Sequence, residues 1–368
     1  MKFADKKVAI VHDWFVGGGA EMVVLELHKM FPDAPIYTSF CSPDWQKKLS
    51  GTKVITSYMQ SWPFSKLRKF LPLLRQKWFE NLDLSSYDLV ISSSGAEAKG
   101  IKVPEGVTHV NYCHAPTHYY WARYDEYIQN PGFGLLDPVA RIGLKLFLKP
   151  MRSWDKKAAG RPDHIIANSN FTASQVKKYY GRESTVIYPP VDVTSFAPSK
   201  KTTRHGFVIT GRHTHYKRFD LAVAACTKLS LPLTVVGDGP ENHKLRKLAG
   251  PTITFAGFLD RKEVIKKVQS AEGFIFPGMD DFGISAVEAL AAGTPVIAYE
   301  SGGALDYITD GKTGMFFNEQ SVDSLSSTLK KFLSIKFDNK VVANSVGMYG
   351  EASFRKKFEQ YVNNVIGD

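Results

Sequence analysis

One stretch constrains the fold of this chain more than any other: Gly278–Gly314, with the sequence GMDDFGISAVEALAAGTPVIAYESGGALDYITDGKTG. Two carboxylates and a Phe-Gly step precede apolar residues at helical spacing, and a Gly-Thr-Pro sequence ends the expected helix. Short apolar strands at 274–276 and 296–298 flank it, so the unit is a βαβ crossover of a parallel sheet. Open sheets of this kind bind ligands at the carboxyl ends of their strands, where helix N–H groups favour an anion.

Two carboxylates of this stretch share a spacing. Asp280 lies in the loop and Glu288 lies about two turns into the helix, with seven residues between them. Each alone is explained as a helix cap or a solvated side chain. Together with the Phe-Gly step and a later Gly-Gly turn, they indicate one site in which carboxylates accept from sugar or ribose hydroxyls and backbone amides hold a diphosphate.

The same stretch resembles the donor-binding signature of the retaining family 4 glycosyltransferases. The family pattern is Glu, seven residues, Glu, and this chain has Asp280 in the first position, one methylene shorter. The resemblance implies that Asp280 acts in catalysis and that five further residues bind the donor: Asp281, Phe282, Gly283, Ile284 and Glu288. It also implies an α/β GT-B fold, with two Rossmann-like doubly wound domains that face each other across a cleft.

The chain of 368 residues exceeds what one core supports, so two domains are expected. We expect residues 1–191 to form an acceptor-side domain, joined by a C-terminal helix at 349–368 that crosses back to it in the resembling fold. Residues 192–348 form the donor domain, and Pro189-Pro190 gives a stiff hinge.

A glycine loop follows the first expected strand, 7–14, and precedes a helix at 20–30. Glycines let the backbone approach a phosphate closely. A G-x-G-x-x-G fingerprint is missing, which disfavours a nicotinamide dehydrogenase. In the resembling family this loop faces the diphosphate or the acceptor, and the matching positions are Gly18, Gly19 and Glu21.

In residues 107–116 an expected strand runs into His114-Ala115-Pro116. A lone histidine in such a place is most often a structural hydrogen-bonding group. The resemblance implies instead that His114 contacts the donor sugar. The residues at the end of another strand are candidates for the lining of an acceptor pocket: Ser93, Ser94, Gly95, Glu97 and Lys99.

The second half begins with a strand at 205–210, followed by Arg212 and Lys217. Two cations at a strand end are often merely solvated, but facing a diphosphate they would neutralise the leaving group. The resembling family has an Arg and a Lys in that role at these positions. Two further strands end in glycine turns that flank the nucleotide base in that family, which makes base-site candidates of Gly239, Phe258 and Leu259.

The Asp280-Asp281 pair invites a Mg²⁺ ion, but an Asp-x-Asp motif is missing and two cations already take that role, so we expect neither metal nor cofactor beyond the nucleotide sugar. Retention of configuration is implied by the resemblance alone, with the departing phosphate taking the acceptor proton. The first half is similar to mannosyltransferases that build O-antigen and capsular polysaccharides, which implies GDP-mannose as the donor and a lipid-linked saccharide as the acceptor.

The net charge of +11 implies an acidic partner. Residues 61–80 and 135–157 mix Lys and Arg with Trp, Phe and Leu. Each segment reads either as an amphipathic helix packed on its own domain or as an interfacial helix on an anionic membrane. Three unpaired cysteines and the lack of a spanning apolar run lead us to expect a cytoplasmic protein, soluble or peripheral on the inner face of the plasma membrane.

Other functions remain open at this point. A UDP-sugar could replace GDP-mannose as the donor, since donor identity depends on few residues. An epimerase or hydrolase on the same fold would consume the donor without an acceptor, and a non-catalytic sugar-nucleotide binder is compatible with Asp280. A nucleic-acid-binding protein is disfavoured because the positive charge is dispersed and no reading motif is present.

Overall fold

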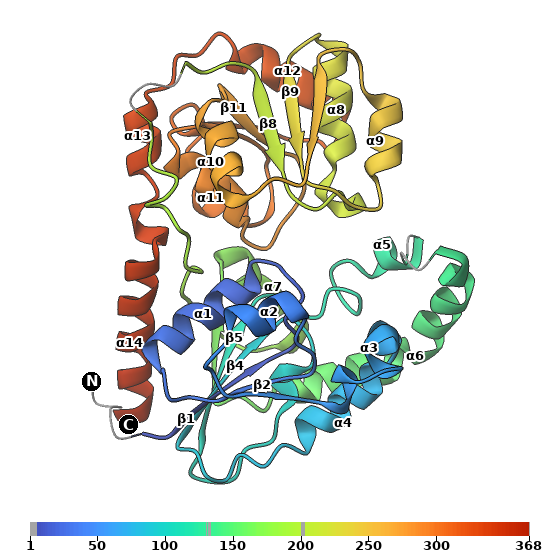
Figure 1. The fold of residues 1–368 in the computed structure, drawn as a ribbon, viewed down its shortest axis with the longest axis vertical. Helices are drawn as coiled ribbons and strands as arrows, with labels where there is room; N and C mark the ends of the chain where they lie inside the picture. Colours follow the sequence, from blue (N-terminus) through green and yellow to red (C-terminus); the bar gives the residue numbers. More distant parts are fainter. Residues whose placement is uncertain (1–5, 130, 132–133, 200–202, 368) are drawn as a thin grey trace. The chain divides into compact units, whose positions relative to one another are not determined.

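The computed structural model describes residues 6–129, 131, 134–199 and 203–367 (Figure 1). The remaining residues of the expected domains, at 1–5, 130, 132–133, 200–202 and 368, lie outside the described residues. The chain divides into two compact units, one of Met1–Pro190 with Phe354–Asp368 and the other of Val191–Ser353. Each unit is built on a parallel sheet with helices packed on it.

The sheet of the first unit has seven parallel strands in the order β3-β2-β1-β4-β5-β6-β7. They are β1 (Val8–His12), β2 (Ile36–Thr38), β3 (Val54–Thr56), β4 (Leu89–Ser94), β5 (Thr108–Cys113), β6 (His164–Ala167) and β7 (Thr185–Val186). Every residue of β1 and β4 is buried, as expected for central strands of a parallel sheet that is covered on both faces.

The helices of this unit fill the crossovers between the strands. They are α1 (Ala20–Met30), α2 (Pro43–Lys48), α3 (Phe64–Leu67), α4 (Pro72–Glu80), α5 (Tyr124–Gln129), α6 (Asp137–Ala159) and α7 (Asn170–Tyr180), with short 3-10 helices η1 (Tyr58–Gln60), η2 (Arg68–Phe70), η3 (Ala98–Gly100) and η4 (Gly134–Leu136). None of the helices in the described part of the chain is long and apolar enough to cross a bilayer.

The last helix, α14 (Glu351–Gly367), completes the core of the first unit. Phe354, Phe358 and Val362 recur every fourth residue, lie on one helical face and are buried in the main apolar cluster. Burial of side chains of this size stabilises by about 1.5–3 kcal/mol each. The ion pair between Arg355 and the buried Glu26 of α1 adds a specific contact. The expected return of the C-terminal helix to the first domain is confirmed.

The second unit has six parallel strands in the order β10-β9-β8-β11-β12-β13. They are β8 (Phe207–Thr210), β9 (Leu233–Val236), β10 (Ile253–Gly257), β11 (Gly273–Phe276), β12 (Val296–Tyr299) and β13 (Gly314–Phe317). The helices are α8 (Phe219–Lys228), α9 (Asn242–Leu248), α10 (Arg261–Gln269), α11 (Ile284–Ala291), α12 (Val322–Phe332) and α13 (Asn339–Asn344), with 3-10 helices η5 (His215–Lys217), η6 (Gly302–Asp306) and η7 (Gly347–Tyr349). The predicted Rossmann-like alternation of strands and helices is confirmed in both units.

In each sheet the strand order reverses at the first strand of the unit. The chain runs from β1 outward to β3 and then returns to β4, on the other side of β1; β8 and β11 have the same relation. The loops that follow these two strands diverge, and the crevice between them is where open α/β sheets bind ligands. Each unit therefore has one such position, after β1 and β4 or after β8 and β11.

The expectation of a single amphipathic helix over residues 61–80 is wrong. The structure divides this segment into α3, η2 and α4, and the last break is at Leu71, whose φ of −118° and ψ of 49° are not helical. The next residue is Pro72, which disfavours helical geometry in the residue before it and itself fits the first position of a new helix.

Candidate functional site

An ion pair joins the two loops of the second unit at its strand-order reversal. Lys217 ends η5, after β8, and Asp280 lies between β11 and α11. The Nζ atom of Lys217 contacts Oδ2 of Asp280, and the two side chains are only 22% and 12% exposed. The sheet topology thus brings together two predicted site residues that are 63 positions apart in the sequence.

The loop around Asp280 is fixed by close backbone packing. The Gly303 N–H donates to the Asp280 carbonyl oxygen at 2.9 Å. A Cβ atom on Gly303 would lie 2.4 Å from Cα of Phe282, so only glycine fits there. The Phe282 ring is buried against Tyr307, with a centroid distance of 5.5 Å, which makes that side chain part of the core. The predicted Gly-Gly turn therefore supports the carboxylate loop directly.

The N-terminus of α11 begins beside this loop without a side-chain cap. Its N-cap residue, Gly283, has a φ of +98°, and a Cβ atom there would lie 2.5 Å from the hydroxyl oxygen of Tyr307. The position therefore requires glycine. Because the first N–H groups of a helix have no partner within the helix, this end can receive the oxygens of an anion. Ile284, another predicted donor contact, is the first residue of α11.

Glu288 lies in the second half of α11 and is almost completely buried. Its Oε1 atom accepts from Nη1 of Arg261 at 2.7 Å. Burial raises the pKa of the Glu288 carboxyl above its ordinary value, and the Arg261 guanidinium opposes that rise. Sequence reasoning identified Glu288 but missed Arg261, whose only signal was its place at the start of the helix that follows the Phe258-Leu259 turn.

The other residues predicted for the donor site also lie near the carboxyl ends of strands in the second unit. Arg212 follows β8 and its side chain is exposed. The Gly239 N–H donates to Asp238 at 2.7 Å, so it is already satisfied. Phe258 is 88% exposed in the loop after β10, whereas Leu259 beside it is half-buried. Their roles, like that of Asp281 in the carboxylate loop, stay predictions.

In the first unit, the glycine loop is braced by its own acidic residue. Gly18 and Gly19 are exposed between β1 and α1. Oε1 of Glu21 accepts from the N–H groups of Val16 at 3.2 Å and Gly17 at 2.7 Å. The Glu21 carboxylate is therefore engaged with the loop backbone and fixes the shape in which the two exposed glycines are presented.

A second carboxylate joins the loops after β1 and β4. Asp13 accepts backbone hydrogen bonds from Gly95 at 2.8 Å, Ala96 at 2.9 Å and Ala98 at 2.7 Å. Three N–H donors to one carboxylate make strong, charge-assisted bonds. Sequence reasoning missed Asp13, because its partners are backbone groups that leave no pattern in the sequence.

His114 follows β5 and is half-buried. Its Nε2 atom lies 2.7 Å from Oγ of Ser93, the residue next to the end of β4. Its carbonyl oxygen accepts from Nδ2 of Asn168 at 2.9 Å. The ring is thus oriented by a neighbouring strand, which suits either a structural role or contact with a sugar.

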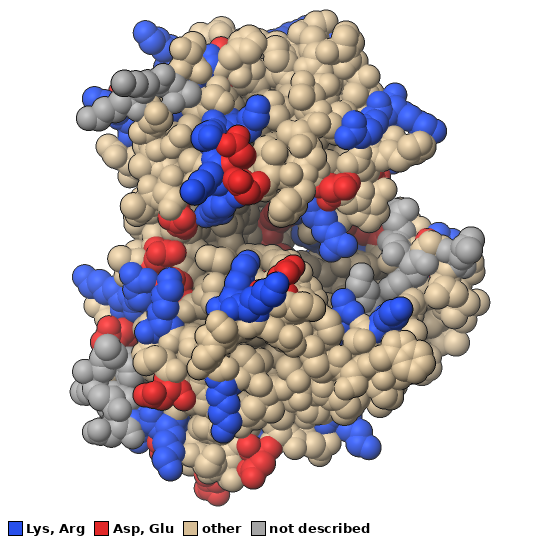
Figure 2. Space-filling model, viewed as in Figure 1, with Lys and Arg blue, Asp and Glu red and all other residues tan. Residues whose placement is uncertain are grey.

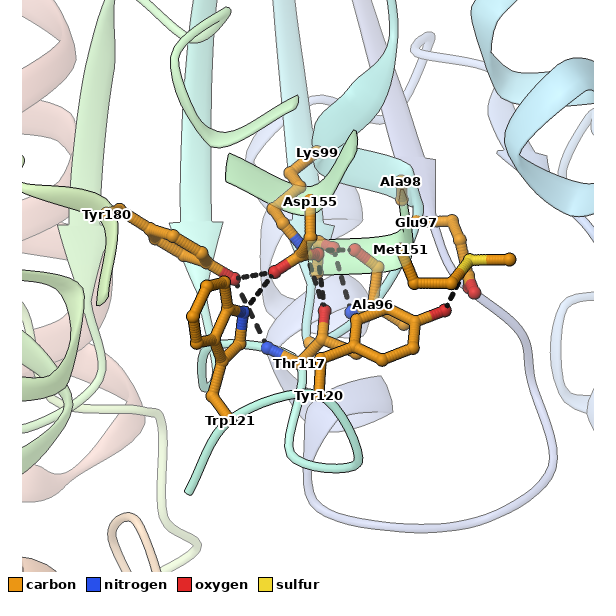
Figure 3. Close-up of polar contacts among 12 residues, drawn as sticks. Ala96, Glu97, Ala98, Lys99, Thr117, Tyr120, Trp121, Met151, Asp155 and Tyr180 are labelled. Carbon is orange, nitrogen blue, oxygen red and sulfur yellow. Dashed lines mark hydrogen bonds and ion pairs between the residues drawn. The ribbon is translucent and has the colours of Figure 1, made fainter. Parts of the chain in front are cut away.

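Two residues that were candidates for the acceptor pocket, Lys99 and Glu97, have buried polar partners within the first unit (Figure 3). Lys99 and Asp155 form an ion pair at 2.7 Å, with side chains 1% and 0% exposed. Asp155 also accepts from three side chains of the loop after β5 and of α7: Thr117 at 2.8 Å, Trp121 at 2.6 Å and Tyr180 at 2.7 Å. Burial raises the pKa of the Tyr180 hydroxyl well above its ordinary range, and the Asp155 charge adds to the rise.

Glu97 is likewise buried and bonded within the unit. Its carboxylate accepts from the Arg75 guanidinium at 2.8 and 3.1 Å and from the Tyr119 hydroxyl at 3.0 Å. The expectation that Glu97 and Lys99 line an acceptor pocket is therefore wrong, since internal partners occupy both charges. They hold the loop after β4 and the loop that carries His114 in place.

Two family models account for most of the chain. Residues 17–195 match the model described as Glycosyltransferase Family 4, and residues 192–346 match Glycosyl transferases group 1. The chain belongs to the family 4 glycosyltransferases. The boundary between the two matches falls close to the boundary between the two structural units of this glycosyltransferase.

Curated relatives of this glycosyltransferase include mannosyltransferases. The alpha-1,3/1,6-mannosyltransferase alg2 of Schizosaccharomyces pombe is 23% identical, over 84% of this chain and 70% of the relative. A GDP-mannose-dependent alpha-(1-6)-phosphatidylinositol monomannoside mannosyltransferase of Mycobacterium tuberculosis H37Rv is 30% identical, over 53% of this chain and 59% of the relative. The chain thus spans about six to seven tenths of the length of these relatives.

Solved structures establish the GT-B fold of this glycosyltransferase. Anabaena HepE, solved with UDP and glucose, has a TM-score of 0.67 at 16% identity, and the likeness covers 97% of this chain and 99% of that one. Sucrose-phosphate synthase from Thermosynechococcus elongatus has a TM-score of 0.71 at 16% identity, covering 98% and 99%.

Proposed function

We propose that this glycosyltransferase is a retaining hexosyltransferase that moves mannose from GDP-mannose to a lipid-linked or saccharide acceptor in cell-surface polysaccharide synthesis. The observation that carries the proposal is the pairing of Lys217 with Asp280 beside the uncapped N-terminus of α11. The mannosyltransferase names of the relatives support the choice of sugar, and one of those relatives is named as GDP-mannose-dependent.

The ion pair indicates how a donor could be received. A diphosphate competes with Asp280 for the Lys217 ammonium and is also attracted by the N–H groups at the start of α11. As Lys217 turns to the phosphate, the Asp280 carboxylate becomes available to accept from a sugar hydroxyl. Arg212, exposed on the same loop, supplies a second positive charge.

Lys217 and Arg212 would also stabilise the charge that develops on the leaving group, which is often the largest catalytic contribution. We therefore propose that transfer needs no metal ion and no cofactor besides the sugar nucleotide. In the retaining step, the acceptor oxygen bonds to the anomeric carbon on the face from which the diphosphate departs. The bond from that carbon to the phosphate oxygen breaks, and the departing phosphate takes the acceptor proton.

Calorimetric titration with GDP, UDP and their mannose and glucose conjugates tests the donor assignment. We expect GDP and GDP-mannose to bind more tightly than the uridine compounds. Tight binding of UDP without binding of GDP would overturn the choice of donor. The anomeric configuration of the product, read by NMR, tests retention, and an inverted product would contradict the proposed step.

We also propose that the first unit binds an anionic membrane surface, on the cytoplasmic side. In α6 the exposed apolar residues Val139, Ile142, Leu146 and Phe147 recur at helical spacing and are 51–70% exposed. Exposed Arg and Lys residues of the same helix, at 141, 145 and 149, provide charges complementary to anionic headgroups.

The second segment also has exposed apolar residues. Trp62 is 76% exposed and Leu73 is 55% exposed. The Trp154 indole N–H of α6 donates to Glu80, the last residue of α4, at 2.8 Å, so the two segments pack beside each other. Figure 2 shows Lys and Arg interspersed with Asp and Glu on the visible face rather than gathered in a continuous basic band. That distribution supports a local lipid contact better than a nucleic-acid groove.

Co-sedimentation with liposomes tests the membrane proposal. We expect binding to vesicles of phosphatidylcholine with phosphatidylglycerol at low salt, and weaker binding after the substitution Leu146→Ser. The control is Leu305→Ser, which removes the same kind of side chain, also more than half exposed (53% against 70% for Leu146), from the second unit. Failure of the unaltered protein to bind these vesicles would refute the proposal.

A further inference from the structure

Two ionic contacts in the second unit converge on one arginine. Nη1 of Arg261 donates to Oε1 of Glu288 at 2.7 Å, and Nη2 lies 3.4 Å from Oδ2 of Asp192. The guanidinium also lies 4.7 Å from the ring centroid of the fully buried Phe196. Arg261 is the first residue of α10, so the start of that helix is connected both to α11 and to the segment that opens the second unit.

The contacts leave one oxygen of Glu288 available. Oε1 is engaged by Arg261, whereas no residue in the described part of the chain donates to Oε2. Oε2 is also not among the buried polar atoms without a partner, so it keeps contact with solvent. Glu288 is therefore a nearly buried carboxylate, anchored through one oxygen and presenting the other.

We propose that Arg261 is a positioning residue for donor binding, which holds the Glu288 carboxylate so that Oε2 accepts from a ribose hydroxyl of the nucleotide. This inference rests on the proposed function, because it requires a sugar-nucleotide donor. Asp192 supports Arg261 from the other side. Its Oδ1 atom accepts from the Ser195 N–H at 3.0 Å, which holds the carboxylate in place as a partner for Nη2 of Arg261.

The charges around Glu288 should make ribose recognition by this carboxylate depend on pH. Burial raises the pKa of the Glu288 carboxyl, Arg261 lowers it and Asp192 raises it. The elements packed on α11 add few titratable groups: β11 has none, β12 has Tyr299 and α13 has Lys340. Without Arg261 the pKa of Glu288 would rise further, and the carboxylate would be protonated over a wider range on the acid side of neutral pH.

The test is calorimetric binding of GDP and 2′-deoxy-GDP, with UDP and 2′-deoxy-UDP in parallel, at about pH 6 and pH 9. A hydrogen bond to a charged group corresponds to about a 10- to 100-fold preference for the ribose form, which we expect of the unaltered protein. Arg261→Gln should lose that preference at pH 6 and regain part of it at pH 9. Arg261→Lys, which keeps the charge, should retain more of it at pH 6.

Two further variants separate positioning from a merely structural role. Glu288→Gln should lack the ribose preference at both pH values. Asp192→Asn breaks the contact between Arg261 and the opening segment but leaves the contact between Arg261 and Glu288. The pH range in which this variant prefers the ribose form should therefore not shift toward alkaline pH. A folded Arg261→Gln protein with the ribose preference and pH dependence of the unaltered protein would overturn the inference alone. If the unaltered protein binds neither GDP nor UDP, the proposed function falls and this inference with it.

Discussion

The substitution Lys217→Ala tests the site most directly, because it removes the cation that joins the loops after β8 and β11. Loss of one donor aimed at developing negative charge costs about 10²–10³ in kcat, or about 2.7–4 kcal/mol. Lys217 is 22% exposed, so water can replace it only in part. Asp280 would also remain as an unpaired carboxylate, 12% exposed, in the place that we propose for the diphosphate, and its charge would repel the donor. We therefore expect the loss in kcat to lie in the upper half of that range.

The assay is the initial rate of GDP release from GDP-mannose with an acceptor, together with calorimetric binding of GDP and a thermal melt. Lys228→Ala is the matched control, because its ion pair with Asp323 lies in the same unit and both side chains are more than half exposed, at 56% and 85%. Such pairs contribute about 0–1 kcal/mol, so the control should keep its rate and melting temperature. A folded Lys217→Ala protein with more than a third of the unaltered kcat would refute the reasoning.

Two other substitutions and one measurement on the unaltered protein have definite expected outcomes. Gly283→Ala places a Cβ atom 2.5 Å from a tyrosine oxygen at a φ of +98°, so it should destabilise the protein by about 1–3 kcal/mol and weaken nucleotide binding, as a thermal melt and calorimetry would show. Lys99→Met leaves Asp155 without its cation in the core and should cost about 3–5 kcal/mol in urea unfolding. Burial raises the pKa of the Cys41 thiol to about 11 and that of Cys226 to about 12, so both should react slowly with Ellman's reagent at pH 8 and quickly in denaturant.

The parts of the fold that sequence reasoning predicted well are those set by local pattern. The strand, glycine step, helix and strand around α11 follow from apolar periodicity and from helix-ending residues, and all are present. The exception, residues 61–80, also had a local cause, because Pro72 interrupts the apolar pattern there. Proline geometry outweighed amphipathic spacing.

The contacts within the site were harder to predict because they depend on how the sheet is ordered. Lys217 and Asp280 were identified separately, but their pairing follows from β8 and β11 being neighbours in the sheet. Arg261 and Glu288 are 27 residues apart, and their side chains meet from two different helices, α10 and α11. Asp13 binds backbone N–H groups, which every residue type offers, so the sequence contains no partner to search for.

The return of α14 to the first unit means that the polypeptide passes between the two units twice, near Pro190 and again near Phe354. A single cut in either connection would leave the halves tethered by the other. During synthesis the core of the first unit would also stay incomplete until Phe354, Phe358 and Val362 have been made. These residues follow the whole of the second unit in the sequence. Until then the apolar residues of the first unit that pack against α14 would be exposed and available to a chaperone. A fragment that stops at Pro190 should therefore aggregate.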